Sequence, residues 1–385
     1  MTDELVPLKN KCNIECDYCY QKFMREEETE ESYDVEKMLS RTRGEFILFG
    51  GEPLLVPLED LEKFFKFGYE KYKKNGIQTN GTLITDRHIA LFNLYAVHVG
   101  ISIDGPEYCN DSRRVGTLEN TRKSTLRTIN AIKALCESGN VPSLIVTLHK
   151  MNASSERLPI LLQWFKDLGL LGIKNVRIHF LENDDCNPIV LSEDELFTAI
   201  TSIMELDCGI NFDLYEEMFK LLTEEKPNVS CTWNSCDPYT TPAVHGIGPQ
   251  GELHNCGRTN KDGHDYIKST RSGNERALAL YFTPQEFQGC KGCRFFFACK
   301  GHCPGESKDW RNRTEHCNVI KRIFTYLEER IIRNGGKPLS LSNKLKKLEF
   351  EVLNVPGAFY KHGDEHGDAW FLGEVEVRTP RLRIA

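Results

Sequence analysis

Apolar residues recur along the first half of this chain with two different periods, which predict strands and helices in alternation. Several short apolar runs have the length and the β-branched or aromatic content of buried strands. They lie at residues 46–49, 97–103, 143–148 and 176–180, with a further strand ending at Thr79 and a short one before Cys12. Between the runs, apolar residues return every three or four positions, as at Leu58, Leu61 and Phe65, which predicts helices with one buried face.

The predicted helices follow the strands one by one. They are expected near residues 58–72, 86–93, 120–137, 158–168 and 192–206, and a last one at 319–333 is stopped by Asn334-Gly335-Gly336. Regular alternation of strand and helix implies a parallel sheet with helices outside it. About six such units suit an α/β fold built as an open, partial (β/α)6 barrel, in which loops at the carboxyl ends of the strands carry the chemistry.

This organisation predicts three regions. Residues 1–215 would form the partial barrel, residues 216–334 a small cysteine-rich domain, and residues 335–385 a C-terminal extension of unknown role. The extension contains a polar run, His362–Trp370, which we interpret as turns on a short β-addition rather than as a metal or acid–base site.

The composition is that of an ordinary globular protein, with 385 residues of which 40% are hydrophobic and 27% charged. A net charge of −7 argues against non-specific nucleic-acid binding, which needs a basic surface. The acidic N-terminus lacks a signal-peptide pattern and no apolar run approaches the roughly 18 residues of a membrane span, so we expect a cytoplasmic protein that does not engage membranes. Fifteen cysteines in such a chain indicate metal binding in a reducing compartment.

Three of these cysteines form a tight motif near the N-terminus. Cys12, Cys16 and Cys19 have the spacing C-x3-C-x2-C, and we call residues 11–21 the first cysteine loop. Thiolates are the usual ligands of iron–sulfur clusters, which normally take four, so three leave one iron of a four-iron cube open to another ligand. The alternatives at this point are a zinc knuckle that lacks its fourth ligand and three unrelated thiols.

Further motifs follow the next strands in a fixed order. The chain has Gly-Gly-Glu-Pro at 50–53 after the second strand, Thr-Asn-Gly-Thr at 79–82 after the third and Ser-Ile-Asp-Gly-Pro at 102–106 after the fourth. Each motif alone is compatible with an ordinary turn. As an ordered set, they resemble the radical S-adenosylmethionine (radical SAM) superfamily. The resemblance implies that the first cysteine loop holds a [4Fe-4S] cluster whose open iron takes S-adenosylmethionine.

The same resemblance implies a set of residues that bind S-adenosylmethionine. They are Gly50, Gly51 and Glu52 for the methionine amino group, Tyr18 beside the adenine, and Ser102 and Arg114 for the carboxylate end. A bidentate guanidinium is a suitable clamp for a carboxylate. Arg113 is adjacent to Arg114 and is the alternative clamp.

Eight further cysteines lie between residues 231 and 317, and two structural zinc sites of four thiolates each are one interpretation of them. Their spacing resembles instead the SPASM extension of radical SAM enzymes, although the closing gap of 13 residues is shorter than the family's usual one. The resemblance implies two auxiliary [4Fe-4S] clusters, and therefore three clusters in all. One auxiliary cluster would be held by Cys231, Cys236, Cys256 and Cys303. The other would be held by Cys290, Cys293, Cys299 and Cys317.

Four ligands for each auxiliary cluster leave no iron open, so these clusters would pass electrons rather than bind substrate, and a net oxidation is favoured. We therefore predict a peptide maturase that forms an oxidative side-chain crosslink, carbon–carbon or carbon–heteroatom, in a ribosomally made peptide. One alternative is a sulfatase-maturase-like dehydrogenase forming formylglycine, although such enzymes carry an acidic residue where this chain has Gly257. Others are a peptide epimerase with Cys109 as hydrogen donor, and, outside enzymes, an iron–sulfur electron carrier or a zinc-built scaffold.

The expected partners are the precursor peptide and an electron donor such as flavodoxin or ferredoxin. Because the cysteine motif begins at residue 12, we expect no N-terminal leader-binding domain. Either a separate protein presents the peptide, or the cysteine-rich region and residues 337–385 bind it, or the substrate is small. The remaining cysteines have no partner spacing and are expected to be buried thiols; they are Cys109, Cys136, Cys186 and Cys208.

Overall fold

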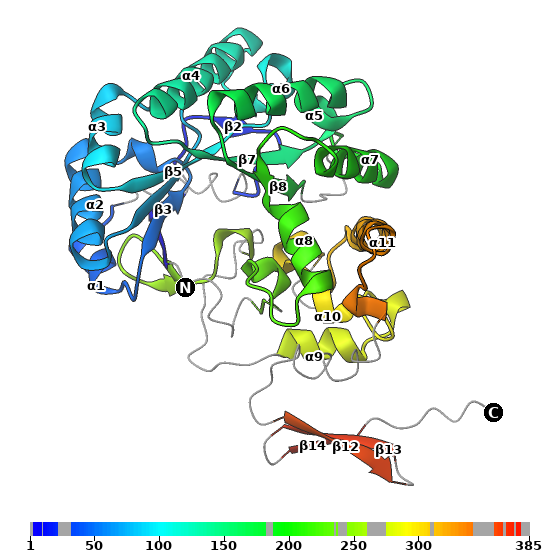
Figure 1. The fold of residues 1–385 in the computed structure, drawn as a ribbon. Coiled ribbons are helices and arrows are strands. Elements are labelled where there is room, and N and C mark those ends of the chain that lie inside the picture. Colours follow the sequence, from blue (N-terminus) through cyan, green and yellow to red (C-terminus); the bar gives the residue numbers. More distant parts are fainter. Residues whose placement is uncertain are drawn as a thin grey trace.

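The chain was analysed as a computed structural model (Figure 1). It describes residues 3–9, 11–21, 32–181, 188–234, 236–237, 245–259, 275–308 and 312–341, together with the strands within 358–378.

A nine-stranded sheet forms the centre of the molecule, in the order β11-β10-β1-β3-β4-β5-β7-β8-β9. Its strands are β1 (Asp3–Leu8), β3 (Phe46–Gly50), β4 (Asn75–Thr79), β5 (Val97–Ser102), β7 (Ser143–Leu148), β8 (Asn175–Phe180), β9 (Asn211–Phe212), β10 (His245–Ile247) and β11 (Leu253–His254). All neighbours pair in parallel except β10 with β11. The six longer strands are those predicted from the sequence, and their parallel order confirms the partial (β/α)6 barrel.

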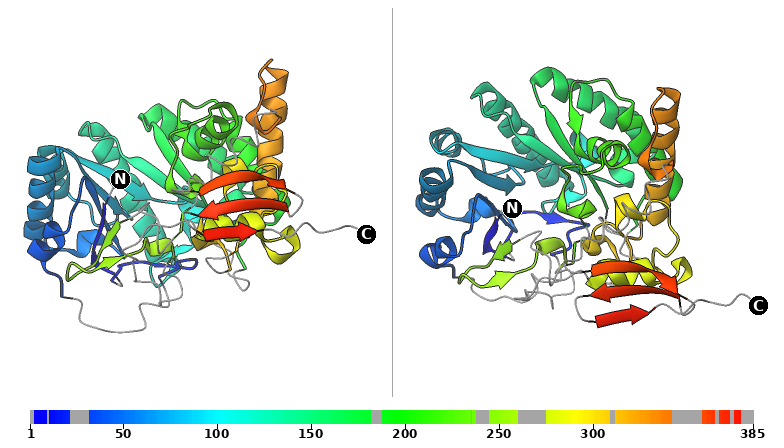
Figure 2. Two further views of the ribbon diagram at one scale, coloured as in Figure 1. Left: turned by 90° about the horizontal axis from the view of Figure 1, so that it is seen from below. Right: turned by 60° about the horizontal axis from the view of Figure 1, so that its bottom comes forward.

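Helices cover the outer side of the curved sheet, as Figure 2 shows. They are α1 (Val35–Ser40), α2 (Leu58–Tyr72), α3 (Asp86–Leu94), α4 (Leu118–Glu137), α5 (Lys150–Ala153), α6 (Leu158–Leu171) and α7 (Glu193–Met204). Their ends have local causes. For example, Ser192 caps α7 through a reciprocal bond with Glu195, and α6 ends at Gly172, whose φ of 105° is left-handed.

The strands have period-two faces, and this places the core. Leu48, Ile77 and Val99 are fully buried on the side of the sheet that packs against the helices, together with Phe64 and Phe65 of α2. The alternate residues face the inside of the barrel. The outer face is therefore a continuous apolar core, whereas the inner face is free to carry polar side chains.

The second cysteine block packs against the last barrel units. It contains α8 (Asp213–Thr223) at its start, then α9 (Glu275–Phe282), α10 (Phe296–Cys299) and α11 (Cys317–Arg333). Helix α11 packs against α7 and α8, so the predicted closing helix joins this region to the barrel. Residues 245–254 return to the sheet as β10, which pairs with β1, and β11, which pairs with β10. The sheet therefore includes residues beyond 215, a feature that strands of two and three residues did not reveal in the sequence.

Residues 358–378 contain a three-stranded antiparallel sheet of β12 (Ala358–Asp364), β13 (Gly367–Leu372) and β14 (Val375–Arg378). The polar run at 362–370 thus falls on two strands of a small β-addition, while Glu365 and His366 lie outside the described residues. Within the described part of the chain, no helix is long and apolar enough to cross a membrane.

Candidate active site

The first cysteine loop lies directly against the Gly-Gly turn that follows β3. The backbone N–H of Gly51 donates to the carbonyl oxygen of Leu8 at 3.0 Å, and that of Glu52 donates to the carbonyl oxygen of Lys11 at 2.9 Å. A Cβ atom added to Gly51 would lie 2.1 Å from the Lys11 oxygen, and Gly50 has a φ of 135°. Only glycine allows this approach and this backbone conformation, so the Gly-Gly pair sets the position of the loop.

A short antiparallel pairing fixes the other side of the loop. Strand β2 (Glu15–Cys16) pairs with β6 (Arg113–Arg114), with Cys16 opposite Arg113. Successive residues of a strand point to opposite faces. The Arg113 side chain is accordingly buried, with 11% exposed, whereas that of Arg114 is 56% exposed and pairs with Asp17 at 2.7 Å. The structure therefore separates the two candidate clamps: Arg113 points inward and Arg114 points to the surface.

The hydroxyl of Tyr18 is hydrogen-bonded to a buried charged pair, Asp104 and Arg113. Its hydroxyl donates to the carboxylate of Asp104 and accepts a hydrogen bond from Nη1 of Arg113 at 2.8 Å. Burial alone would raise the pKa of Asp104, but the Arg113 guanidinium and His149 beside it bring that pKa below its usual value. Asp104 is therefore a carboxylate, and it orients the aromatic residue that precedes Cys19.

Glu52 is fully buried and ties together the carboxyl ends of β3 and β4. Its carboxylate accepts hydrogen bonds from the backbone N–H of Leu54 at 3.0 Å, the hydroxyl of Thr79 at 2.7 Å and the backbone N–H of Asn80 at 2.8 Å. The Gly-Gly-Glu-Pro and Thr-Asn-Gly-Thr motifs thus meet through one side chain. A direct contact between Glu52 and a methionine amino group stays a prediction.

The eight cysteines of the second block come together in space as two groups. The first thiol group, defined by electrostatic interactions among its thiols, is Cys231, Cys236, Cys256 and Cys303. The second thiol group is Cys290, Cys293, Cys299 and Cys317. These are the two sets that the family resemblance implied, and Cys303 crosses to the first group. In the same way, Cys16 interacts with Cys12 and Cys19 in the first cysteine loop.

The thiols are chemically suited to a positively charged metal core. Burial, with added repulsion from neighbouring thiols, raises the pKa of Cys16, Cys290 and Cys303 to about 12. Such thiols ionise only when a cation compensates them. Among the described residues, no three His, Cys, Asp or Glu side chains converge on one point as a single metal ion would require. In a four-iron cube each iron takes one thiolate, so a group of four such thiols would supply one cube.

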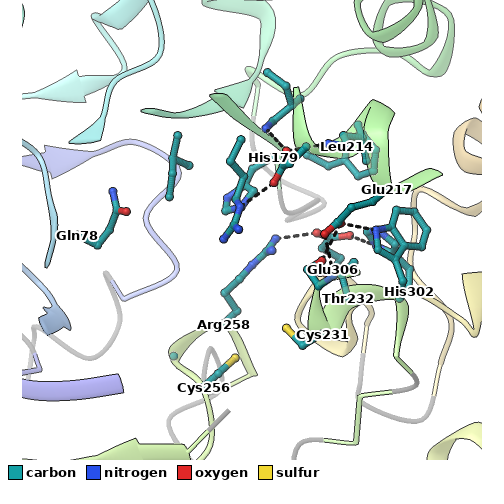
Figure 3. Close-up of a pocket in the computed structure, with 18 of the residues that line it drawn as sticks. Gln78, His179, Leu214, Glu217, Cys231, Thr232, Cys256, Arg258, His302 and Glu306 are labelled. Carbon is teal, nitrogen blue, oxygen red and sulfur yellow. Dashed lines mark hydrogen bonds and ion pairs between the residues drawn. The ribbon is translucent and has the colours of Figure 1, made fainter. Parts of the chain in front are cut away.

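A cavity of about 210 Å³ lies between the inner face of the barrel and the first thiol group (Figure 3). Gln78 and His179 line it from the strands, and Cys231, Cys256 and Arg258 line it from the cysteine block. A second cavity of about 400 Å³ shares Ile47, Gln78, Ile145, Arg177 and Asp213 with it and extends to the amino ends of the strands. The two cavities therefore share part of the inner face of the barrel as a common wall.

Two glycines on the inner face leave room for neighbouring side chains. Gly76 and Gly100 lie on neighbouring strands, and a Cβ atom at Gly100 would lie 2.2 Å from Oε1 of Gln78. The Gln78 amide can then donate to the hydroxyl of Ser102 at 2.8 Å. Ser102, predicted to bind the carboxylate of S-adenosylmethionine, is thereby linked to Gln78, which lines both cavities.

Burial shifts the pKa values of two side chains in the cavity wall, Glu4 and His179. Burial raises the pKa of Glu4 to about 7 despite Arg177, and within the described residues one Glu4 carboxylate oxygen is buried without a hydrogen-bond partner. Burial also holds the pKa of His179 well below its usual value, with Arg258 and Arg177 acting in the same direction. The imidazole of His179 is therefore neutral, and Glu4 is a carboxyl group able to exchange a proton near neutral pH.

Glu306 forms the opposite case, a buried carboxylate held charged by its neighbours. It accepts a bond from Arg258 at 2.7 Å and contacts Nδ1 of His302 at 2.6 Å. Burial would raise its pKa, but these two partners hold that pKa well below the usual value. The ion pair fixes the direction in which Arg258 points across the cavity.

The position where related dehydrogenases carry an acidic residue offers no carboxyl group in this chain. A Cβ atom at Gly257 would lie 2.9 Å from the Tyr20 hydroxyl, so Tyr20 takes the space of a side chain there. Cys109 is fully buried and does not line either cavity, which fits a packed thiol rather than a hydrogen donor. Cys136 and Cys208 are partly buried, and Cys186 lies outside the described residues.

Sequence reasoning missed the inner-face residues. Glu4, Gln78, Arg177 and His179 are polar residues inside apolar strand runs, at alternate positions. A polar side chain at an inward position of a barrel strand is the signal that could have found them.

Residues 6–158 match the model of the Radical SAM superfamily. The chain is 25% identical over 345 residues to a serine-type anaerobic sulfatase-maturating enzyme of Bacteroides thetaiotaomicron, covering 77% of this chain and 81% of that protein. It is 32% identical over 125 residues to a cysteine-type anaerobic sulfatase-maturating enzyme of Clostridium perfringens, covering 28% of this chain and 34% of that protein.

Solved structures share the fold over most of the chain. The structure of anSMEcpe with bound AdoMet and a Cp18Cys peptide superposes with a TM-score of 0.67 at 18% identity, covering 86% of this chain and 98% of that one. Streptococcus suis SuiB bound to S-adenosylmethionine gives a TM-score of 0.54 at 15% identity, covering 82% and 76%. At these identities the likeness concerns the fold.

Proposed function

The chain carries a radical SAM domain and is a radical SAM enzyme, and we propose that it oxidises a residue within a peptide or protein substrate. We favour the reaction of an anaerobic sulfatase-maturating enzyme, in which a cysteine or serine becomes an aldehyde. The gathering of the eight cysteines into two groups of four, the first of which lines the cavity through Cys231 and Cys256, is the observation that supports an oxidation most directly. The similarity to sulfatase-maturating enzymes along 77% of the chain supports the substrate class.

Each part of the site then has a role in holding a reactant. When bound, S-adenosylmethionine and the three clusters would supply a radical that takes a hydrogen atom and an acceptor for the electron that the oxidised residue releases. The first cysteine loop, Gly50, Gly51, Glu52 and Ser102 would hold S-adenosylmethionine. We assign the carboxylate clamp to Arg113, since it points into the site beside Tyr18, whereas Arg114 pairs with Asp17 at the surface.

The substrate side chain would bind in the cavity at the inner face of the barrel. Converting a serine to an aldehyde removes one hydrogen atom, one electron and one proton from the substrate. With a cysteine, the same three losses give a thioaldehyde, which water converts to the aldehyde with release of hydrogen sulfide. Because Gly257 offers no carboxyl group, we assign the proton to Glu4, which has an unpartnered oxygen in the cavity wall among the described residues. Glu217 also lines the cavity but is saturated by Ser230 and Trp233, so Glu217→Gln is the matched control for Glu4→Gln in product formation.

A side-chain crosslink is the second candidate reaction. It is favoured by Gly257, because the acidic residue that related dehydrogenases carry at this position is missing. Both reactions remove two hydrogens, and both need a peptide partner and an electron donor such as flavodoxin or ferredoxin. A separate leader-binding protein and a cytoplasmic location belong to this proposal as well.

The test uses the anaerobically reconstituted enzyme with peptides that contain a cysteine or a serine. Mass spectrometry would detect oxidation, and a hydrazide probe would label an aldehyde but not a crosslink. We expect a hydrazide-reactive product that is absent with Cys12→Ala/Cys16→Ala/Cys19→Ala. An oxidised peptide that does not react with hydrazide would favour the crosslink, and S-adenosylmethionine cleavage with no change in any peptide would contradict both.

A further inference from the structure

Arg276 is a fully buried arginine at the start of α9, and its guanidinium is bound by backbone carbonyl groups. Nη1 donates to the carbonyl oxygens of Cys236 at 3.3 Å and His302 at 3.0 Å. Nη2 donates to those of Gly301 at 3.4 Å and Asn312 at 3.0 Å. One side chain therefore joins three separate segments of the cysteine block.

Two of these carbonyl groups belong to an unusual turn. Lys300, Gly301 and His302 all have left-handed backbone angles, with φ of 49°, 83° and 62°. Residues other than glycine rarely adopt this conformation, and a bulky residue does so only where its surroundings hold it there. The turn lies between Cys299 of the second thiol group and Cys303 of the first. The guanidinium thus holds the turn that sends two nearby cysteines to different groups.

The positive charge of Arg276 also acts on thiols of both groups. Its guanidinium interacts electrostatically with thiols of both, namely Cys236, Cys303 and Cys290. Arg258 interacts with thiols of the first group, and Arg313 with thiols of the second. Among the described residues of the block, Arg258 thus interacts with the first group, Arg313 with the second, and Arg276 with both.

We propose that Arg276 is a positioning residue common to both auxiliary clusters, which fixes the crossover turn and favours the reduced form of each cluster. A four-iron core with four thiolates carries net negative charge, and taking up one electron increases that charge by one. A guanidinium stays protonated, and its field is weakly screened in a buried site, so it stabilises the added charge. The inference rests on the proposed function, since it requires both thiol groups to hold clusters.

The experiment measures the reduction midpoints of the clusters in the reconstituted holoenzyme by anaerobic titration followed by electron paramagnetic resonance. Arg276→Gln keeps amide N–H donors but removes the charge. Arg276→Lys keeps the charge but loses the planar guanidinium, whose two Nη groups donate to the carbonyl oxygens. Arg258→Gln and Arg313→Gln are the single-group controls. We expect Arg276→Gln to lower both auxiliary midpoints by at least a tenfold change in the oxidised-to-reduced ratio, about 59 mV for one electron, and each control to lower one of them.

Iron content separates this inference from the proposed function. A wild type with about four irons would remove the clusters and with them the proposed function. A full iron content in Arg276→Gln with unchanged midpoints would overturn the role of Arg276 alone. If Arg276→Gln loses iron from both groups while Arg276→Lys retains it, the need for a shared charge is supported. Equal iron loss in both variants would overturn the charge effect and leave a packing role.

Discussion

Arg113 and Arg114 are adjacent on β6 and point to opposite sides of it, one into the site beside Tyr18 and one to the surface beside Asp17. The pairing of β6 with the first cysteine loop produces this division, because it makes the two residues part of a strand. A sequence motif cannot distinguish them, whereas the pairing does.

Replacing Arg113 should therefore weaken binding of S-adenosylmethionine, and replacing Arg114 should not. Loss of a charged hydrogen-bonding group is worth about 1.5–3 kcal/mol, which corresponds to roughly a tenfold to hundredfold weaker affinity for Arg113→Gln. Calorimetric titration of the reconstituted protein with S-adenosylmethionine measures this directly. Equal losses in Arg113→Gln and Arg114→Gln would contradict the assignment.

Gly51→Ala should displace the first cysteine loop. The added methyl group would overlap the Lys11 carbonyl oxygen, so the backbone before Cys12 must move. We expect the variant to lose the iron of the first cluster, about four atoms, while keeping that of the second block. Gly139→Ala is the control, since Gly139 has a φ of 84° but nothing within 4 Å of an added Cβ atom. Full iron content in Gly51→Ala would show that the loop tolerates the shift.

The stability gained by Glu4→Gln should depend on pH. In the folded protein the pKa of Glu4 is about 7, above its ordinary value of 4.5, so ionising Glu4 opposes folding. The penalty is absent below pH 4.5, grows between pH 4.5 and 7 and is constant above, with about 1.4 kcal/mol for each pKa unit. Thermal unfolding should show Glu4→Gln to be more stable than wild type at pH 8 and closer to it at pH 5. The same difference at both pH values would contradict a raised pKa for Glu4.

Glu306→Ala should destabilise the cysteine block strongly. It removes the buried partner of Arg258 and His302 and leaves uncompensated charge, which costs about 3–5 kcal/mol in comparable buried pairs. The surface pair of Asp194 with Arg322 provides the control, because Asp194→Ala should cost less than about 1 kcal/mol. Both values come from thermal unfolding of the reconstituted protein under anaerobic conditions.

Much of the barrel follows from patterns that are local in sequence. The period-two runs at 143–148 and 176–180 coincide with β7 and β8 to within a residue, because a buried strand and its covering helix each leave a periodic signal. Strands β2, β6, β9 and β11 each have only two residues and leave none, and their pairing depends on contacts between distant segments. The inward position of the Arg113 side chain therefore could not be predicted from the sequence.

In the candidate site, as in the barrel, features that depend on contacts between distant segments could not be predicted from the sequence. The two groups of four were expected only because the cysteine spacing resembles that of a known family; the spacing alone also allowed two zinc sites. The inner-face residues Glu4 and His179 could not be related to each other, since they line one cavity only when the sheet curves. Arg276 gave no signal at all, because its partners are backbone carbonyl groups that any sequence supplies.

Iron and sulfide counting after anaerobic reconstitution tests the central claim of three clusters most directly. The measurement compares wild type with Cys12→Ala/Cys16→Ala/Cys19→Ala. About twelve irons in wild type, falling to about eight in the triple variant, is the expected result, since three cubes of four irons would become two. About four irons in wild type, with zinc bound by the second cysteine block, would contradict the oxidative mechanism.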